Sequence, residues 1–329
     1  MKALSDWPRP KNNTGIGLHY NTKPAGPPTA DVIALWKRMG EQRIKLLANG
    51  DDMVNNSRLL SQAGFEIMVR FYAPPINLGV PASDLMKKYA QAGVTWAEGL
   101  TNEPEIEWNK PPNATNIDNL ARQHIKFADA CSSVGLLPLT PAIQGDRVFT
   151  WFAPFVARVI ALNRRDALEG SAIACHARPA NHEPGVPPPG FCFRSYELFD
   201  DVIKAALGAS LPIFSTEAGY EPGSHEDNTC PEINIDLHSR YGVEMVQMNW
   251  RPALFGILFW SWLDDWFESG WWCNRRYGTL PIVKAFETMT KPSHEIDIVV
   301  PPPPPPVIDL PIVITLDGVT YRGSVKKDA

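Results

Sequence analysis

A segment with helical periodicity that ends in glycine and is followed by a short apolar run recurs along most of this chain. In one copy, Thr29 precedes the periodic segment, Gly40 ends it, and the apolar run 43–47 follows. Glycine suits the position after a helix because it adopts the left-handed conformation without a Cβ clash. Eight apolar runs occur in this pattern, and they begin near residues 15, 43, 66, 96, 136, 172, 211 and 256.

The spacing of these runs limits the fold class. The seven intervals between residues 15 and 256 average about 34 residues, which is the length of a β-α-β unit. Strands that alternate with helices form parallel sheets, and eight such units predict a (β/α)8 TIM barrel. A doubly wound open sheet is the alternative. It is disfavoured because the first run, at residues 15–19, lacks the third glycine of a phosphate-binding turn. One continuous helix is expected over residues 151–169.

The C-terminal part of the chain has a different composition. Residues 301–306 are six consecutive prolines, which form a stiff polyproline II spacer. Residues 307–329 alternate apolar and polar side chains around Asp317 and Gly318, a two-residue hairpin signal. We therefore expect a barrel at 1–298, a linker at 299–306 and a β-hairpin at 307–329.

An isolated hairpin is marginally stable in water. The segment 307–329 is therefore expected to add to another sheet, to dock on the barrel, or to pair with a second chain in a homo-oligomer. A disordered tail is the alternative.

Charge and hydropathy exclude several classes of partner. The net charge is −5, from 31 basic and 36 acidic residues, which gives no electrostatic footprint for nucleic acid. No apolar run is long enough for a membrane span. No signal peptide is visible at the start of the chain, so the protein is either cytoplasmic or has lost a leader, and the compartment stays open.

The cysteine pattern predicts no metal knuckle and no redox motif. The chain has five cysteines and no CxxC pair. Buried or free thiols are favoured over a single disulfide within the group of Cys192, Cys230 and Cys273.

Two carboxylates follow apolar runs at the positions where a barrel builds its active site. Glu103 follows the run 94–100 and Glu217 follows the run 211–216. The carboxyl ends of the strands carry the active site in barrels of this kind, and the two runs lie three apart in a ring of eight. The two side chains are expected to converge at the barrel mouth. A carboxyl pair suits glycosidic bond cleavage, and mutual repulsion should keep one of the two groups protonated near neutral pH.

Three motifs resemble those of clan A glycoside hydrolases. Residues 100–104, Leu-Thr-Asn-Glu-Pro, resemble the Asn-Glu-Pro motif that ends strand 4 in that clan. Residues 214–220 are similar to the strand 7 segment with the nucleophile, and residues 258–262 are similar to the strand 8 segment with an aromatic platform. The resemblance covers residues 14–290 in the right order.

This resemblance implies roles for individual residues. Glu103 would be the acid/base and Glu217 the nucleophile, with retention of the anomeric configuration. Asn102 would hydrogen-bond the sugar 2-hydroxyl.

The chain also departs from family 5 of the clan. Many members have an arginine near the end of strand 2, where this chain has Lys45 and Asn49, while Arg70 lies on strand 3. Many also have His-x-Tyr after strand 6, where this chain has His176-Ala177-Arg178. The resemblance therefore implies the clan rather than this family, and it leaves the substrate open.

Further side chains at the strand ends are candidates for substrate binding. Trp260 could stack under a pyranose ring, with core filling as the alternative. His176 could bond a sugar hydroxyl or the nucleophile, or simply cap a neighbour. Arg70 could hold Glu217 ionised or form a structural ion pair. The remaining candidates for lining a cleft are Tyr20, Tyr220, Trp262, Trp266, Trp271 and Trp272.

The proline-rich loop 179–190 is expected to shape one end of the groove. His182 and Glu183 in this loop could form a metal site with His225 and Glu226, but solvated side chains are the favoured interpretation. No metal and no organic cofactor are therefore expected.

The leading hypothesis is a retaining β-glycoside hydrolase acting on a β-linked oligo- or polysaccharide. The main alternative is a non-catalytic carbohydrate-binding barrel that uses the tryptophan-rich rim. A lyase or aldolase barrel with Lys45 as the Schiff-base residue is a third hypothesis.

Overall fold

The structure, a computed structural model, describes residues 2–21, 26–72, 80–99, 101–107, 111–262, 271–274, 278–295, 308–316 and 319–327. The chain forms two compact units, Met1–Glu295 and Ile296–Ala329. The predicted proline spacer at 301–306 and the turn residues Asp317 and Gly318 lie outside the described residues.

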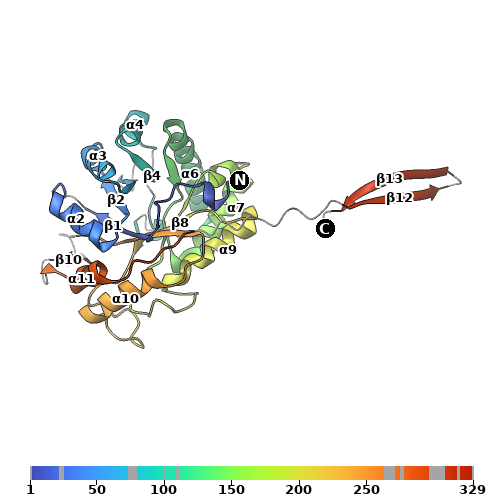
Figure 1. The fold of residues 1–329 in the computed structure, drawn as a ribbon. Coiled ribbons are helices and arrows are strands. Elements are labelled where there is room, and N and C mark those ends of the chain that lie inside the picture. The colour runs from blue at the N-terminus through green and yellow to red at the C-terminus, as the bar shows by residue number, and fades with distance from the viewer. Residues whose placement is uncertain are drawn as a thin grey trace. The chain divides into compact units, whose positions relative to one another are not determined.

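A curved parallel sheet forms the centre of the first unit (Figure 1). Its strands lie in the order β5-β4-β3-β2-β1-β9-β8-β7-β6. Their bounds are β1 Ile16–Tyr20, β2 Arg43–Ala48, β3 Glu66–Phe71, β4 Val94–Glu98, β5 Leu137–Leu139, β6 Ile143–Gln144, β7 Ile173–His176, β8 Ile213–Ala218 and β9 Leu254–Phe259.

The two edges of this sheet meet within one chain segment, because β5 and β6 are separated by only three residues. Isolated parallel bridges join Leu139 to Ala172 and Asn102 to Ala142 across this break. The fifth predicted run is therefore split into β5 and β6, and the bridges on either side close the ring. The predicted (β/α)8 barrel is confirmed.

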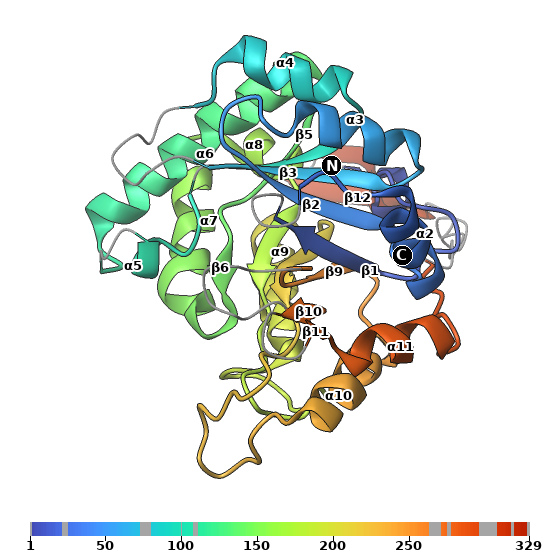
Figure 2. The same ribbon diagram turned by 90° about the vertical axis from the view of Figure 1, so that its left-hand side faces the viewer.

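Helices surround the strands on the outside of the sheet (Figure 2). The longer helices are α2 Ala30–Met39, α3 Val54–Gln62, α4 Ser83–Gln91, α6 Ala114–Val134, α7 Ala153–Ala161, α9 Tyr196–Leu207, α10 Ile235–Gln247 and α11 Pro281–Thr288. The short ones are α5 Pro104–Glu107 and α8 Arg165–Glu169.

The prediction of one helix over 151–169 is wrong. This segment contains α7 and α8, with a break at residues 162–164. Asn163 adopts a left-handed conformation there, with φ 57°. Asparagine tolerates that conformation better than most residues, and one left-handed residue is enough to interrupt a helix.

The residues at the two ends of α2 begin and end this helix as the sequence predicts. The Thr29 hydroxyl accepts a hydrogen bond from the Val32 backbone N–H, and Gly40 ends α2 with φ 89°. Apolar side chains of this helix then pack on the sheet, where Trp36 is fully buried. The core therefore includes the layer between the strands and the helices as well as the barrel interior.

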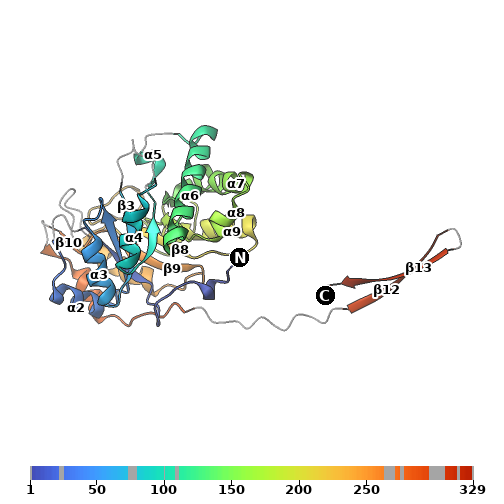
Figure 3. The same ribbon diagram turned by 90° about the horizontal axis from the view of Figure 1, so that it is seen from above.

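The second unit contains two antiparallel strands, β12 Ile308–Leu316 and β13 Val319–Lys327 (Figure 3). Their register runs from Ile308 opposite Lys327 to Leu316 opposite Val319.

Two further expectations concern the described residues as a whole. No helix there has the length and hydropathy needed to cross a membrane. All five cysteines are free, as expected: three are buried, and Cys230 and Cys273 are partly exposed.

We predict that replacing Gly15 with alanine strongly destabilises the barrel. Gly15 has φ 72°, and a Cβ there would lie 2.2 Å from the Trp250 ring, which is itself stacked on His294. Left-handed strain and overpacking together should lower the free energy of unfolding by about 2–4 kcal/mol in denaturant titrations. Gly64→Ala is the matched control, because Gly64 has φ 92° with nothing within 4 Å of the added Cβ. Equal losses in the two variants would contradict the packing argument.

Candidate active site

Glu103 follows β4 at a point where the backbone is strained. Its φ is 37°, in the left-handed region. Its backbone N–H donates to the carbonyl oxygen of Ala142 at 2.9 Å, and Pro104 begins α5 immediately afterwards. The strand bridge on one side and the helix on the other hold this conformation. Strain of this kind persists where surrounding structure enforces it, and it concentrates at functional sites.

Glu217 lies within β8, with its side chain inside the barrel mouth and only 2% exposed. Its carboxylate, the carboxylate of Glu103 and the ring of His176 form one group, in which the nearest oxygen and nitrogen atoms all lie within 4.8 Å of one another. The fold thus brings together two acids that are 114 residues apart in sequence.

His176 ends β7 and lies between the two acids. Its Nδ1 is 2.6 Å from Glu103 Oε1 and 3.6 Å from Glu217 Oε2. Gln144, at the end of β6, donates from Nε2 to the same Glu103 oxygen at 3.1 Å. Glu103 Oε1 is therefore held from two neighbouring strands.

Three cationic side chains surround the carboxylate of Glu217. Arg178 donates directly to Oε2. Lys45 Nζ and Arg70 NH1 each lie 3.8 Å from Oε1. Burial opposes ionisation of Glu217, but His176 and these three cations outweigh it and hold its pKa well below the usual value. At 3.8 Å, Arg70 is too far to form the expected hydrogen bond with Glu217 and acts on it through charge, while its hydrogen bond goes to Glu107, which is the structural ion pair left open as the alternative.

The pKa of Glu103 is also lowered. Burial and the nearby Glu217 charge both raise it, but the charge and the hydrogen bond of His176 dominate. The expectation that repulsion keeps one carboxyl protonated near neutral pH is therefore wrong for this structure. That expectation weighed only the repulsion between the two acids, and it left out the effects of His176, Arg178 and Lys45.

Lys45 is completely buried and forms an ion pair with a second carboxylate beneath the site, that of Glu98. Its Nζ lies 2.6 Å from Glu98 Oε2 and donates to the Thr216 carbonyl at 3.3 Å. The Thr216 hydroxyl donates to Glu98 Oε1 at 3.0 Å. This network of β2, β4 and β8 fixes the floor beneath Glu217.

Arg70 and Asn102 converge on Glu107 in α5. Arg70 NH2 is 2.7 Å from Glu107 Oε1, and Asn102 Nδ2 donates to the same oxygen at 2.9 Å. The Oδ1 atom of Asn102 is buried without a hydrogen-bond partner among the described residues. It is an unused acceptor next to the acid pair.

His19 is a site residue that the sequence argument did not select. It is buried, both ring nitrogens lack hydrogen-bond partners among the described residues, and its ring meets Trp260 edge-on at 4.7 Å. Burial, followed by the charge of Lys45, holds the pKa of His19 well below its usual value. Trp260 is half-buried and also lies 5.9 Å from the Arg178 guanidinium.

Two residues expected to bind substrate lie on the other side of the strands. Tyr20 and Trp262 both pack edge-on against Trp36, and both are buried. Neighbouring residues of a strand point to opposite faces, so the strand that directs His19 inward directs Tyr20 toward the helices. Both are therefore core residues, and the expectation that they bind substrate is wrong.

A pocket lies beside the acid pair. Its walls include Gln144, His176 and Arg178, and the expected rim residue Trp271 also lines it. Ala180, Gly190 and Phe191 from the proline-rich loop contribute, as do Gly219, Ser224 and Glu226 from the loop after β8.

The other described aromatic residues that were expected at the rim of the cleft do not line this pocket. Tyr220 is buried and donates from its hydroxyl to the His182 carbonyl at 2.9 Å. Trp272 is fully buried against Phe286. Trp266 lies outside the described residues.

Comparison with known proteins gives matches in structure only, since no family model and no curated protein sequence matches the chain. The chain is similar to a fungal β-1,4-galactanase, with 14% identity, a TM-score of 0.56, and coverage of 83% of this chain and 94% of that one. It is similar to a GH128 subgroup II endo-β-1,3-glucanase of Sorangium cellulosum, with 14% identity, a TM-score of 0.51, and coverage of 85% and 100%.

A third match is the β-glucuronidase of Lactobacillus rhamnosus, with 13% identity and a TM-score of 0.52, covering 83% of this chain and 48% of that one. The shared fold is the (β/α)8 barrel. At these identities the likeness concerns the fold alone.

We predict that Lys45→Met destabilises the protein by about 3–5 kcal/mol at neutral pH, since it leaves the Glu98 carboxylate buried without its cation. Denaturant unfolding measures the loss. Lys88→Met is the matched control, because the Lys88–Asp51 pair at 3.0 Å is exposed on both sides and should contribute less than about 1 kcal/mol. Adding Glu98→Gln to Lys45→Met should restore part of the loss. Similar values for the two lysine variants would contradict a structural role for the buried pair.

Proposed function

We propose that this protein is a retaining β-glycoside hydrolase that acts on a β-linked oligo- or polysaccharide. The observation that carries the proposal is the buried pair Glu103 and Glu217, whose nearest oxygens are within 4.8 Å. Retaining enzymes have carboxyl groups about 5–5.5 Å apart, whereas inverting enzymes need about 6.5–9.5 Å to admit a water molecule. The short separation supports attack by a carboxylate.

In the first step, Glu217 attacks the anomeric carbon as the bond to the leaving oxygen breaks. The cations around Glu217 favour its ionised form, which is the form that attacks. The leaving oxygen takes a proton from Glu103. Because Glu103 Oε1 and His176 Nδ1 are only 2.6 Å apart, we infer that this proton is held between the two side chains before transfer.

In the second step, the Glu103 carboxylate removes a proton from water, which attacks the anomeric carbon. The bond to Glu217 breaks and the sugar leaves with its original configuration. Asn102 Oδ1 and the ring nitrogens of His19 are buried polar atoms without partners among the described residues. We propose that they form hydrogen bonds with sugar hydroxyls. Trp260 is the side chain for stacking.

The rival hypotheses fit the site less well. A binding barrel has no need for two buried carboxylates held in hydrogen-bonding contact with His176 and Arg178, since burying charge is costly. An aldolase or lyase would need Lys45 as a free amine. Lys45 Nζ is instead engaged by the Glu98 carboxylate at 2.6 Å and by the Thr216 carbonyl at 3.3 Å, so it does not face the pocket as a free nucleophile.

The structural neighbours indicate which substrates to screen first. Two structural neighbours are named for activity on β-1,4-galactan and β-1,3-glucan. A panel of β-linked polysaccharides that includes these two is therefore the first screen. Binding without hydrolysis across the panel would favour the carbohydrate-binding alternative.

We predict that Glu217→Ala lowers turnover more than about 10³-fold, as loss of a covalent nucleophile does. Azide or formate should rescue part of this activity by occupying the space of the carboxylate. NMR of the first product released by the natural protein should show the β-anomer. Near-normal activity of the variant, or an α-anomer as first product, would refute the mechanism.

We predict that Arg178→Gln shifts the acid limb of the kcat/KM profile to higher pH by about one unit or more. The Glu217 carboxylate must be ionised to attack, so activity falls as the pH drops through its pKa. Removing the Arg178 charge raises that pKa. Arg178→Lys keeps the charge and should keep the limb near its original position. A uniform drop in activity without movement of the limb would show that Arg178 acts only in packing.

A further inference from the structure

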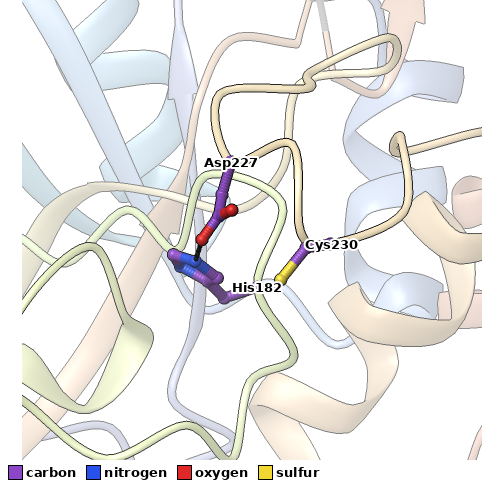
Figure 4. A group of neighbouring side chains, drawn as sticks. All are labelled: His182, Asp227 and Cys230. Carbon is purple, nitrogen blue, oxygen red and sulfur yellow. Dashed lines mark hydrogen bonds and ion pairs between the residues drawn. The ribbon is translucent and has the colours of Figure 1, made fainter.

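Two loops meet beside the pocket, one after β7 and one after β8. Figure 4 shows His182 of the first loop and Asp227 and Cys230 of the second, with their side chains directed toward one another. The sequence raised a metal site for His182 with other partners, but it favoured solvated side chains and no metal. Glu183 instead accepts from the Tyr241 hydroxyl at 3.4 Å, and His225 is exposed.

The three side chains offer one nitrogen, one oxygen and one sulfur within a small volume. These atoms all lie within 4.8 Å of one another. The shortest separation is 2.8 Å, between His182 Nε2 and Asp227 Oδ2. The side chains of His182 and Asp227 are 19% and 37% exposed, so the group is sheltered but can be reached from solvent.

The orientation of the His182 ring favours a cation between it and Asp227. Nδ1 lies 2.5 Å from the Phe191 carbonyl oxygen, and it must carry a hydrogen to face that oxygen. In the neutral ring, Nε2 then presents a lone pair to the Asp227 carboxylate. Only a proton or a metal ion between the two groups removes the repulsion between this lone pair and the carboxylate. A backbone carbonyl on the second ring nitrogen is also the usual partner of a metal-binding histidine.

The backbone around the three side chains is fixed by a buried asparagine. Asn181 donates from Nδ2 to the Asp227 and Cys230 carbonyls at 2.8 and 3.2 Å, and its Oδ1 accepts from the Asp227 N–H at 2.9 Å. Ala180, immediately before it, has φ 53°. A non-glycine residue in that region is strained, and strain is retained where the surroundings enforce a geometry.

The remaining carboxylate oxygen of Asp227 has its own partners. The backbone N–H and the hydroxyl of Thr229 donate to Oδ1 at 2.8 and 2.7 Å. Oδ2 is thereby directed at the His182 ring. A ligating carboxylate held by such hydrogen bonds is a common feature of metal sites.

We propose that His182, Asp227 and Cys230 bind a single Zn²⁺ ion, with water completing the tetrahedron. Thiolate, imidazole and carboxylate together are the donor set that zinc takes in proteins, whereas magnesium and calcium take oxygen ligands alone. Binding would displace the thiol proton of Cys230 and any proton shared by His182 and Asp227.

The acid pair with His176 is the other group of this kind among the described residues. It is a poor site for a dication, because Lys45, Arg70 and Arg178 all lie within 4 Å of Glu217. Asp227, by contrast, forms no ion pair with a lysine or arginine of the described part of the chain. The charge distribution therefore directs a metal ion to the loops.

The ion would act as a clamp on the pocket. The loop of His182 supplies Ala180 and Phe191 to the pocket wall, and the loop of Asp227 supplies Ser224 and Glu226. Joining the two loops through one ion holds both walls at a fixed separation. The inference does not depend on the proposed activity, since metal content is measured directly.

The test is zinc stoichiometry of the full chain. After loading with ZnSO₄ and removal of free metal, elemental analysis should find one equivalent of zinc in the natural protein and loss of that equivalent in Cys230→Ser and Asp227→Asn. Cys273→Ser and His225→Asn are matched controls that should keep it. Co²⁺ in place of zinc should give a thiolate charge-transfer band in the near ultraviolet that is absent from Cys230→Ser.

A second measurement uses the unaltered chain, in case a variant does not fold. Zn²⁺ should slow alkylation of Cys230, followed by mass spectrometry, and leave the rate at Cys273 unchanged. Absence of stoichiometric zinc would overturn the proposal and leave a simple His182–Asp227 ion pair. Zinc that persists in Cys230→Ser, or that binds without protecting Cys230, would show that Cys230 is not a ligand and would also overturn it.

Discussion

The burial of the Glu217 carboxylate among cations is the interaction on which the rest of the site depends. A carboxylate that is 2% exposed is stable only if its charge is balanced, and Lys45, Arg70 and Arg178 do so from three different strands or strand ends. Each cation is in turn held in place: Lys45 by Glu98, and Arg70 by Glu107 of α5. The barrel must therefore close correctly before the charge can be accommodated.

This balance gives the two acids different surroundings, in line with the different roles proposed for them. Glu217 has three cations and stays ionised, which suits a nucleophile. Glu103 has a single arginine, Arg178, at 4.0 Å, and its Oε1 lies 2.6 Å from Nδ1 of the His176 ring. Two identical side chains thus acquire different chemistry from their neighbours, as in other sites where paired carboxyls divide the work of an acid and a nucleophile.

Sequence patterns predicted the positions of the two acids better than those of the side chains around them. Glu103 and Glu217 follow apolar runs and belong to motifs, so their position at strand ends could be predicted. Tyr20 and Trp262 could not be separated from true cleft residues in the same way, because the inward or outward direction of a strand residue depends on register. His19 was not selected as a site residue because a single histidine in an apolar run carries no motif.

The sequence by itself determined the repeated strand and helix order, the glycine stops and the two acids, because these depend on local backbone preference and on spacing along the chain. Tertiary structure decided which charges meet. Closure of the ring brings to Glu217 cations that lie 39 to 172 positions away in sequence. It also brings His182 next to Asp227 and Cys230, which belong to a separate loop. Electrostatic balance and ligand geometry are properties of that closed arrangement, and no local pattern encodes them.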